Sequence, residues 1–172
     1  TNSGWTISGR IDAVIDGVLV DVKSTSSFGY VKYTTEGINV GNDSFGYISQ
    51  LSGYAALGQG LANTPPAFLF IDKQNGHIKP VHIDPLPKED IIVKINNIAT
   101  TVQLGSDLHA KRGYATKPIG KSGNEGLGTA CSYCPFKWKC WPGLRGFIYS
   151  NGPVYLTNVK KEPNVPEMNY GQ

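Results

Sequence analysis

Apolar and polar residues alternate along residues 10–23 on both sides of Asp16-Gly17. This dipeptide favours a two-residue type I′ turn, so the segment is predicted to be a β-hairpin. A second strand pair is expected over residues 67–72 and 77–83, with its turn at residues 74–76. Apolar residues at helical spacing predict a helix over residues 44–58, capped by Ser44, and a longer helix over residues 88–110.

The other segments show weaker patterns. Residues 24–43 are rich in Ser, Thr, Gly and Asn and are expected to form a loop with a short strand at residues 30–33. Residues 113–130 are predicted to be a loop, and a tail without strong periodicity follows Pro142. No apolar run approaches the roughly 18 residues that a membrane span needs, and the first residues do not have the pattern of a secretory signal.

The two parts of the chain differ in charge, although its net charge is only +3. Residues 1–100 contain seven Lys or Arg and nine Asp or Glu, whereas residues 101–172 contain nine and four. The acidic part is suited to hold cations and the basic part to meet phosphates. Ordinary surface variation explains the same division equally well.

Pairing across the predicted turn places Asp12 opposite Asp21, and it separates apolar from polar side chains. One face carries Ile11, Ala13, Ile15, Val18, Val20 and Val22, and the other carries Arg10, Asp12, Val14, Leu19, Asp21 and Lys23. Two carboxylates with Cβ atoms about 5 Å apart repel each other unless a divalent cation such as Mg²⁺ or Mn²⁺ lies between them. Lys23 is then placed to stabilise charge on a phosphate. The alternative is a solvated face on which Arg10 and Lys23 screen the aspartates, and the hairpin alone does not decide between the two.

Gln50 and Tyr54 are four residues apart in the predicted helix, so their side chains share one face. Both can bond a phosphate oxygen or a water molecule. Because a tyrosine on a half-buried helix usually serves packing, this pair is weak evidence when taken alone.

These residues occur in the order Gly9-x-x-Asp12, Asp21-x-Lys23 and Gln50-x-x-x-Tyr54. In this order they resemble the RecB-like branch of the PD-(D/E)XK nuclease superfamily. The resemblance covers residues 7–141. It implies an α/β, restriction-endonuclease-like domain over residues 1–141, with a mixed central β-sheet flanked by helices and a cysteine-rich closing segment. Residues 142–172 would be a C-terminal extension.

The resemblance also implies roles for single residues. Asp12, Asp21 and the backbone carbonyl of Val22 would bind the metal, and Lys23 would be the catalytic lysine. Gln50 and Tyr54 would contact DNA or order the site. Family members carry a helix before the hairpin, often with an acidic or His residue that completes the site, and this sequence begins too late to include it.

The three cysteines lie within ten residues, and such an odd, clustered set indicates metal binding in a reducing compartment. We therefore expect a cytoplasmic location in a bacterial, archaeal or phage-infected cell. Three thiolates suggest zinc or an iron–sulfur cluster, each of which usually takes four ligands. The cysteines are Cys131, Cys134 and Cys140, and the candidates for a fourth ligand are His77, His82 and His109.

The resemblance favours a [4Fe–4S] cluster, because nucleases similar to AddB and to CRISPR-associated RecB-like exonucleases carry three C-terminal cysteines at this spacing. Their fourth cysteine lies upstream of the hairpin. Zinc, or three cysteines without a metal, are the alternatives. Basic and aromatic residues beside the cysteines are candidate DNA contacts, although such stretches are often ordinary surface. They are Lys137, Trp138, Lys139 and Arg145.

The activity expected is that of an Mg²⁺- or Mn²⁺-dependent deoxyribonuclease. An exonuclease is favoured, acting on single-stranded DNA or DNA ends in recombination, repair, phage DNA metabolism or CRISPR adaptation, together with a partner protein of one of these processes. One alternative is an endonuclease or helicase-associated nuclease domain of the same fold. The other is a non-catalytic DNA-binding module whose nuclease site is unused.

Overall fold

The computed structural model describes residue 4 and residues 6–58, 64–103 and 116–168. The chain is divided into two compact units, Thr1–Leu104 and Gly105–Gln172. The cysteine segment, which was expected to belong to one domain over residues 1–141, lies in the second unit together with the C-terminal tail. Each unit contains helices and a sheet, which agrees with the general α/β class.

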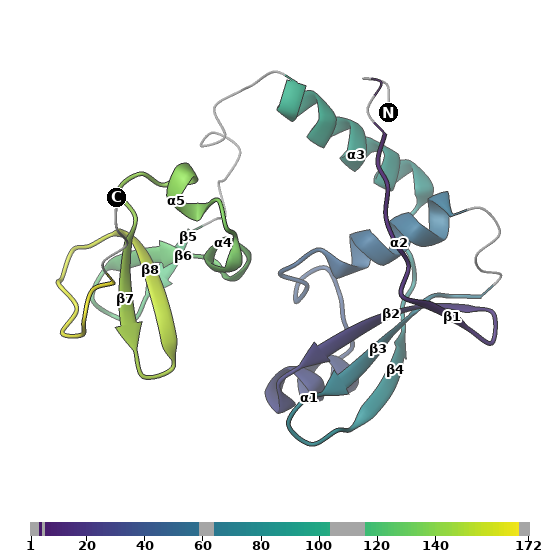
Figure 1. Cartoon of the computed structure of the whole chain (residues 1–172), viewed down its shortest axis with the longest axis horizontal. Helices are drawn as coiled ribbons and strands as arrows, with labels where there is room; N and C mark the ends of the chain where they lie inside the picture. Colours follow the sequence, from purple (N-terminus) through teal and green to yellow (C-terminus); the bar gives the residue numbers. More distant parts are fainter. Residues whose placement is uncertain (1–3, 5, 59–63, 104–115, 169–172) are drawn as a thin grey trace. The chain divides into compact units, whose positions relative to one another are not determined.

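The first unit is built on a mixed sheet whose strands lie in the order β1-β2-β3-β4. The strands are β1 (Ala13–Ile15), β2 (Val18–Thr25), β3 (Ala67–Asp72) and β4 (Ile78–His82). Strands β2 and β3 are parallel, and the two outer pairs are antiparallel. Parallel strands need a crossover connection, and here it contains the helices α1 (Ser27–Thr35) and α2 (Tyr47–Leu57) (Figure 1).

The hairpin formed by β1 and β2 has the predicted register, with Ala13 opposite Val20 and Ile15 opposite Val18. Asp16 and Gly17 both have positive φ angles, of 50° and 78°, as a type I′ turn requires. The pairing prediction is therefore confirmed for the strand residues next to the turn.

Helices α1 and α2 pack on the sheet face that carries Leu19, Asp21 and Lys23. The core on this face consists of Leu19, Ile38, Ile48, Leu51, Phe68, Phe70 and Ile83. On the opposite face, in the described part of the chain, Val22 is 37% exposed and Ile78 is 60% exposed. The polar face of the hairpin is thus the covered one, and the apolar face is partly open.

The third helix of this unit, α3 (Lys88–Gln103), packs beside α2. It begins where it was predicted, and the predicted residues 104–110 lie outside the described residues. Two expectations about the helices that cover the sheet were wrong. Residues 30–33 belong to α1 and not to a strand, because Ser26 caps that helix by accepting a hydrogen bond from the Gly29 amide at 3.3 Å. Helix α2 begins at Tyr47 with Gly46 as its N-cap residue and not at Ser44, and the Asp43 carboxylate satisfies its first turn by accepting from the amides of Tyr47 and Ile48.

The second unit contains an antiparallel sheet in the order β5-β6-β8-β7. Its strands are β5 (Thr116–Ile119), β6 (Asn124–Leu127), β7 (Arg145–Tyr149) and β8 (Gly152–Asn158), and the short helices α4 (Thr129–Tyr133) and α5 (Lys137–Cys140) lie between β6 and β7. From the sequence, a loop was expected over residues 113–130 and a tail without strong periodicity after Pro142, so the strands of this sheet were not predicted. No helix among the described residues is long and apolar enough to cross a membrane.

Candidate functional site

Asp21 is a carboxylate inside the first unit, only 4% exposed. Strand β2 places it beside Phe68 of β3, under the helices that cover this face. Its Oδ2 lies 2.6 Å from the Nζ of Lys23, which projects from the same face two residues later. This burial contradicts the alternative of a solvated hairpin face, as far as Asp21 is concerned.

Burial raises the pKa of Asp21 above its ordinary value of 3.8. The ammonium of Lys23 acts in the opposite direction, and the negative charge of Asp12 raises the pKa further. Among the described residues, no backbone amide or hydroxyl donates to Oδ2, and the Lys23 ammonium is the group that balances its charge. A divalent cation would give this buried oxygen a second positive partner.

Asp12 is exposed and lies just before β1, near the end of the hairpin. Its Oδ2 accepts a hydrogen bond from the Val22 amide at 2.8 Å. This bond ties Asp12 to the part of β2 between Asp21 and Lys23, so the predicted neighbourhood of the two aspartates is present. One carboxylate is thus solvent-accessible and the other is buried, with a lysine beside them.

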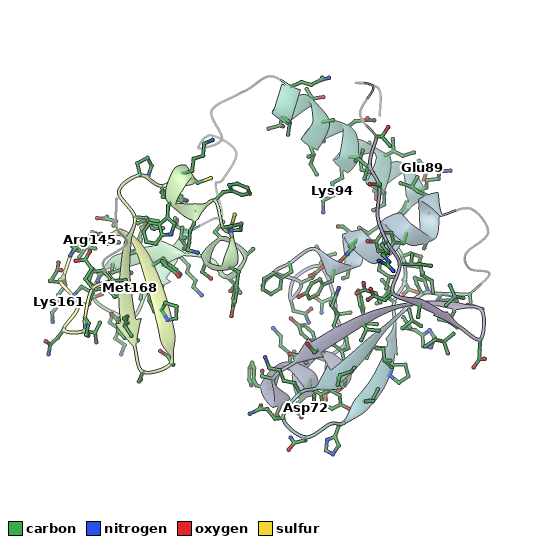
Figure 2. All side chains as sticks on the ribbon, in the orientation of Figure 1. Asp72, Glu89, Lys94, Arg145, Lys161 and Met168 are labelled. Atoms are coloured by element: carbon green, nitrogen blue, oxygen red, sulfur yellow. The ribbon has the colours of Figure 1, made fainter. Side chains whose placement is uncertain are left out.

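Asp72, at the end of β3, is a buried carboxylate with a structural role and can be compared with Asp21 (Figure 2). It accepts hydrogen bonds from the hydroxyl of Ser27, the amide of Gln74 and the side-chain amide of Asn75. Burial alone would raise its pKa, but these donors lower it. Asp72 therefore has several uncharged donors, whereas the partner of Asp21 is the Lys23 ammonium.

Helix α2 turns three polar side chains toward the hairpin, at the spacing i, i+3 and i+7: Tyr47, Gln50 and Tyr54. Gln50 donates a hydrogen bond through Nε2 to the Tyr54 hydroxyl at 3.2 Å. Tyr54 also packs against the core, in agreement with the expectation that a tyrosine on a half-buried helix serves packing. The two predicted helix residues are thus bonded to each other.

Gly9 explains the glycine of the first motif. A Cβ atom at this position would lie 2.4 Å from Cε1 of Tyr54, closer than real contacts allow. The absence of a side chain therefore lets the segment before β1 pass directly over the tyrosine ring.

Tyr47 is a site residue that the sequence analysis missed. The Nζ of Lys23 lies 4.5 Å from the centre of its ring, a cation–π contact. Burial raises the pKa of Tyr47, and the charges of Asp43 and Asp21 add to this effect. The sequence did contain a signal for Tyr47: it lies three residues before Gln50, so the two side chains share one face of the helix.

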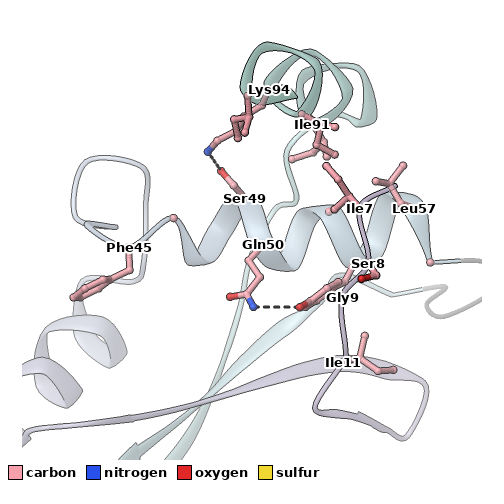
Figure 3. A pocket seen from close by; sticks show the side chains of 16 residues that line it. Ile7, Ser8, Gly9, Ile11, Phe45, Ser49, Gln50, Leu57, Ile91 and Lys94 are labelled. Carbon is pink, nitrogen blue, oxygen red and sulfur yellow. Dashed lines mark hydrogen bonds between the residues drawn. The ribbon is translucent and has the colours of Figure 1, made fainter. Parts of the chain in front are cut away.

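A cavity of about 620 Å³ adjoins this group of residues within the first unit (Figure 3). Its walls come from residues 7–11, α2 and α3, and Gln50 and Tyr54 belong to its lining. Asp12, Asp21 and Lys23 do not line the cavity, so Gln50 and Tyr54 are the candidate residues that connect it with the site.

In the second unit, the cysteines lie on α4, directly after it and at the end of α5. They form no disulfide. Among the described residues, no group of three or more His, Cys, Asp or Glu side chains is gathered closely enough to hold a metal ion. Cys131, Cys134 and Cys140 therefore do not form a ready cluster site as they are placed, and the predicted [4Fe–4S] cluster or zinc remains a prediction.

The histidines named as substitute ligands have other surroundings. His82 lies with its Nδ1 at 3.3 Å from the Pro65 carbonyl oxygen, and the His77 ring lies 6.2 Å from that of Tyr30. His109 lies outside the described residues.

The basic residues near the cysteines differ in how far contacts within the protein engage them. Arg145 is held by Glu162 and Glu167, whose carboxylates accept hydrogen bonds from its guanidinium. Lys137 donates to the Cys134 carbonyl and lies over the Tyr155 ring. Lys139 is exposed. Arg145 thus has a structural role that the sequence analysis did not foresee.

Comparisons with protein-family models, curated proteins and solved structures returned no match. Statements about activity therefore rest on the residues of this chain.

Proposed function

We propose that the first unit is a divalent-cation-dependent nuclease that hydrolyses phosphodiester bonds of DNA. One observation carries the proposal above all: Asp21 is a buried carboxylate with a raised pKa, and it lies beside Lys23 and near the second carboxylate of Asp12. A buried carboxylate with a perturbed pKa beside a charged partner is typical of functional sites.

Asp12, Asp21 and the carbonyl of Val22 would hold Mg²⁺ or Mn²⁺, ions that prefer oxygen ligands. When bound, the ion supplies Lewis acidity and positive charge to a phosphodiester. Lys23 keeps its ammonium at this place through Asp21 and the Tyr47 ring, so that its charge is available to the phosphate as negative charge develops. Gln50 and Tyr54 offer an amide and a hydroxyl for contacts to DNA.

An exonuclease acting on single-stranded DNA or DNA ends is the form of this activity that we favour, because Gln50 and Tyr54 of the site also line a cavity. Such an enzyme would work in the cytoplasm with a recombination, helicase or CRISPR-adaptation partner. A [4Fe–4S] cluster on the three cysteines belongs to the same proposal, and Lys137 and Lys139 would contact DNA. A colourless, zinc-containing protein after anaerobic purification would contradict the cluster.

The test is cleavage of labelled single- and double-stranded DNA with Mg²⁺, with Mn²⁺ or with EDTA. We expect cleavage only with the cations. Asp21→Asn should reduce it by more than about a hundredfold, since even residues that merely orient metal ligands contribute about 10- to 100-fold.

The matched control is Asp16→Asn, which changes the same residue type in the same hairpin and leaves an Asn-Gly turn of the same preferred kind. It should cut like the parent. Equal rates for Asp21→Asn and the parent would refute the residue assignment, and binding without metal-dependent cleavage would favour a non-catalytic DNA-binding module.

A further inference from the structure

The cavity beside α2 has the size of a small-molecule site, at about 620 Å³. Most of its wall is apolar and comes from three parts of the first unit. These side chains are Ile7, Ile11, Phe45, Leu57, Ile91, Ile95 and Ile98. A ligand that fits must therefore present apolar surface to the cavity.

The same cavity also contains a cation that the proposed reaction does not use. Lys94 of α3 donates a hydrogen bond through Nζ to the Ser49 hydroxyl at 2.6 Å (Figure 3). Within the described residues no carboxylate lies within ion-pair distance of Lys94, since the ion pairs found there involve only Lys23 and Arg145. Ser49 thus positions a positive charge that no carboxylate pairs with in the described part of the chain, and a negatively charged ligand group would complement it.

The cavity adjoins the candidate site. Gln50 and Tyr54 belong to both, and Ile11 of the cavity wall directly precedes Asp12. In Figure 3 the Gln50 side chain and Ile11 lie on the hairpin side of α2, while Lys94 reaches α2 from α3. A chain-like ligand bound in the cavity would pass from Lys94 toward the aspartates.

We propose that this cavity binds the unstacked bases of single-stranded DNA next to the bond that is cut, with Lys94 on a backbone phosphate. The choice of DNA rests on the proposed function. A base has apolar faces for the isoleucines and Phe45, and polar edges for the Gln50 amide. In a duplex the bases are paired and stacked inside the helix, so the intact duplex cannot place them in the cavity.

The experiment measures binding without cleavage, by fluorescence anisotropy in EDTA. The probes are a short fluorescein-labelled oligothymidylate and an abasic oligomer of the same length and charge. We expect the parent to bind oligothymidylate about tenfold or more tightly than the abasic oligomer, because each bound base contributes appreciably to affinity.

Gly53→Leu is the variant that fills the cavity. Gly53 lines it, and a Cβ there would meet only Ile91 Cγ2, at an ordinary 3.9 Å. This variant should lose the preference for bases, while Gly53→Ala, which adds one methyl group, should keep it. Lys94→Met should weaken binding of both oligomers severalfold, and Lys88→Met, an exposed residue of the same helix outside the cavity, should not.

Equal affinity of the parent for the two oligomers would overturn the proposal. So would full base preference in a folded Gly53→Leu protein, which would mean that the cavity holds another occupant, such as an apolar chain. These results are independent of cleavage. A protein that cuts DNA with Mg²⁺ but ignores the bases contradicts only the cavity proposal, and one that prefers bases but never cuts contradicts only the nuclease.

Discussion

Asp21 and Asp72 are both buried on the first sheet, but their surroundings shift their pKa values in opposite directions. Asp72 has several donors, which lower its pKa, whereas burial raises the pKa of Asp21 in spite of Lys23. The sequence placed Asp21 correctly, because alternation along a strand and the turn dipeptide define the face. It did not reveal the burial, which depends on helices that pack from elsewhere in the chain.

The raised pKa of Asp21 makes a prediction for stability. Between the ordinary aspartate pKa of 3.8 and the higher pKa in the folded protein, the folded state binds more protons than the unfolded state. Stability therefore falls as the pH rises through this window, and the full cost is present at neutral pH. Asp21→Asn removes the charge and should melt at a higher temperature than the parent at neutral pH.

Thermal unfolding followed by circular dichroism over a range of pH would check this. The difference between the two proteins should shrink as the pH falls toward 3.8. An Asp21→Asn protein that melts below the parent at neutral pH would mean that the contact with Lys23 outweighs the cost of burial.

Divalent cations should act on the same residue. A ligand that binds only the folded state stabilises it by about 2.7 kcal/mol at a hundred times its Kd. We expect Mg²⁺ or Mn²⁺ to raise the melting temperature of the parent and to leave that of Asp21→Asn unchanged. An equal rise in both proteins would place the cation elsewhere.

Gly9 offers a test of how the tyrosine ring is positioned. In Gly9→Ala the new methyl group must displace the Tyr54 ring, which breaks the hydrogen bond from Gln50. A shift of this size near a reacting group costs on the order of 10- to 100-fold in rate. Gly143→Ala, at a glycine with open space around it, is the control for a kinetic comparison. Unchanged cleavage by Gly9→Ala would mean that Tyr54 does not act in the site.

At the scale of elements, the strands and the two long helices of the first unit were predictable from the sequence. The exact start of α2 and the presence of α1 were not. The register of the hairpin followed from Asp16-Gly17, and β3 has the predicted bounds. Helix α1 was missed because its sequence, rich in Ser, Thr and Tyr, has low helix propensity. The packing of Tyr30 and Tyr33 against the core stabilises α1 despite this low propensity.

The N-terminus of α2 gives a testable prediction, because Asp43 and not Ser44 satisfies its first turn. Asp43 accepts hydrogen bonds from the amides of Tyr47 and Ile48, at 3.0 and 2.9 Å. Asp43→Ala should lower the free energy of unfolding of the first unit by about 1–2 kcal/mol. Ser44→Ala, one residue away, should change it by less than about 0.5 kcal/mol. Urea denaturation of both variants would check this, and a larger loss in Ser44→Ala would restore Ser44 as the cap.

At the scale of the whole molecule, the division into two units was not predictable from the hydrophobic pattern. Strands β5 and β6 read Thr-Lys-Pro-Ile and Asn-Glu-Gly-Leu, with almost no alternation of apolar and polar residues. Their sheet depends on β8, which lies some thirty residues later and pairs with β6. Local patterns cannot reveal pairing of this kind.

Arg145 gives a prediction for the second unit alone. Its guanidinium joins the start of β7 to Glu162 and Glu167. Because the pairs are partly exposed, Arg145→Gln should lower stability by only about 1 kcal/mol. Tryptophan fluorescence would detect it, since two of the three tryptophans, Trp138 and Trp141, lie in this unit. Metal-dependent cleavage should not change, and a loss of cleavage would contradict the assignment of the site to the first unit.

The turn at Asp16-Gly17 has a further consequence, for the chemical ageing of the protein. In an Asp-Gly sequence the backbone nitrogen of the glycine readily attacks the side-chain carboxyl carbon of the aspartate, because glycine has no side chain to hinder the approach. Water is released as a cyclic succinimide forms, and water then opens this ring at its other carbonyl. The product, isoaspartate, carries an extra carbon in the main chain and disturbs the short connection on which the hairpin register depends. Asp12 would then leave its place beside β2. Stored protein should therefore lose its cation-dependent properties without any change in mass.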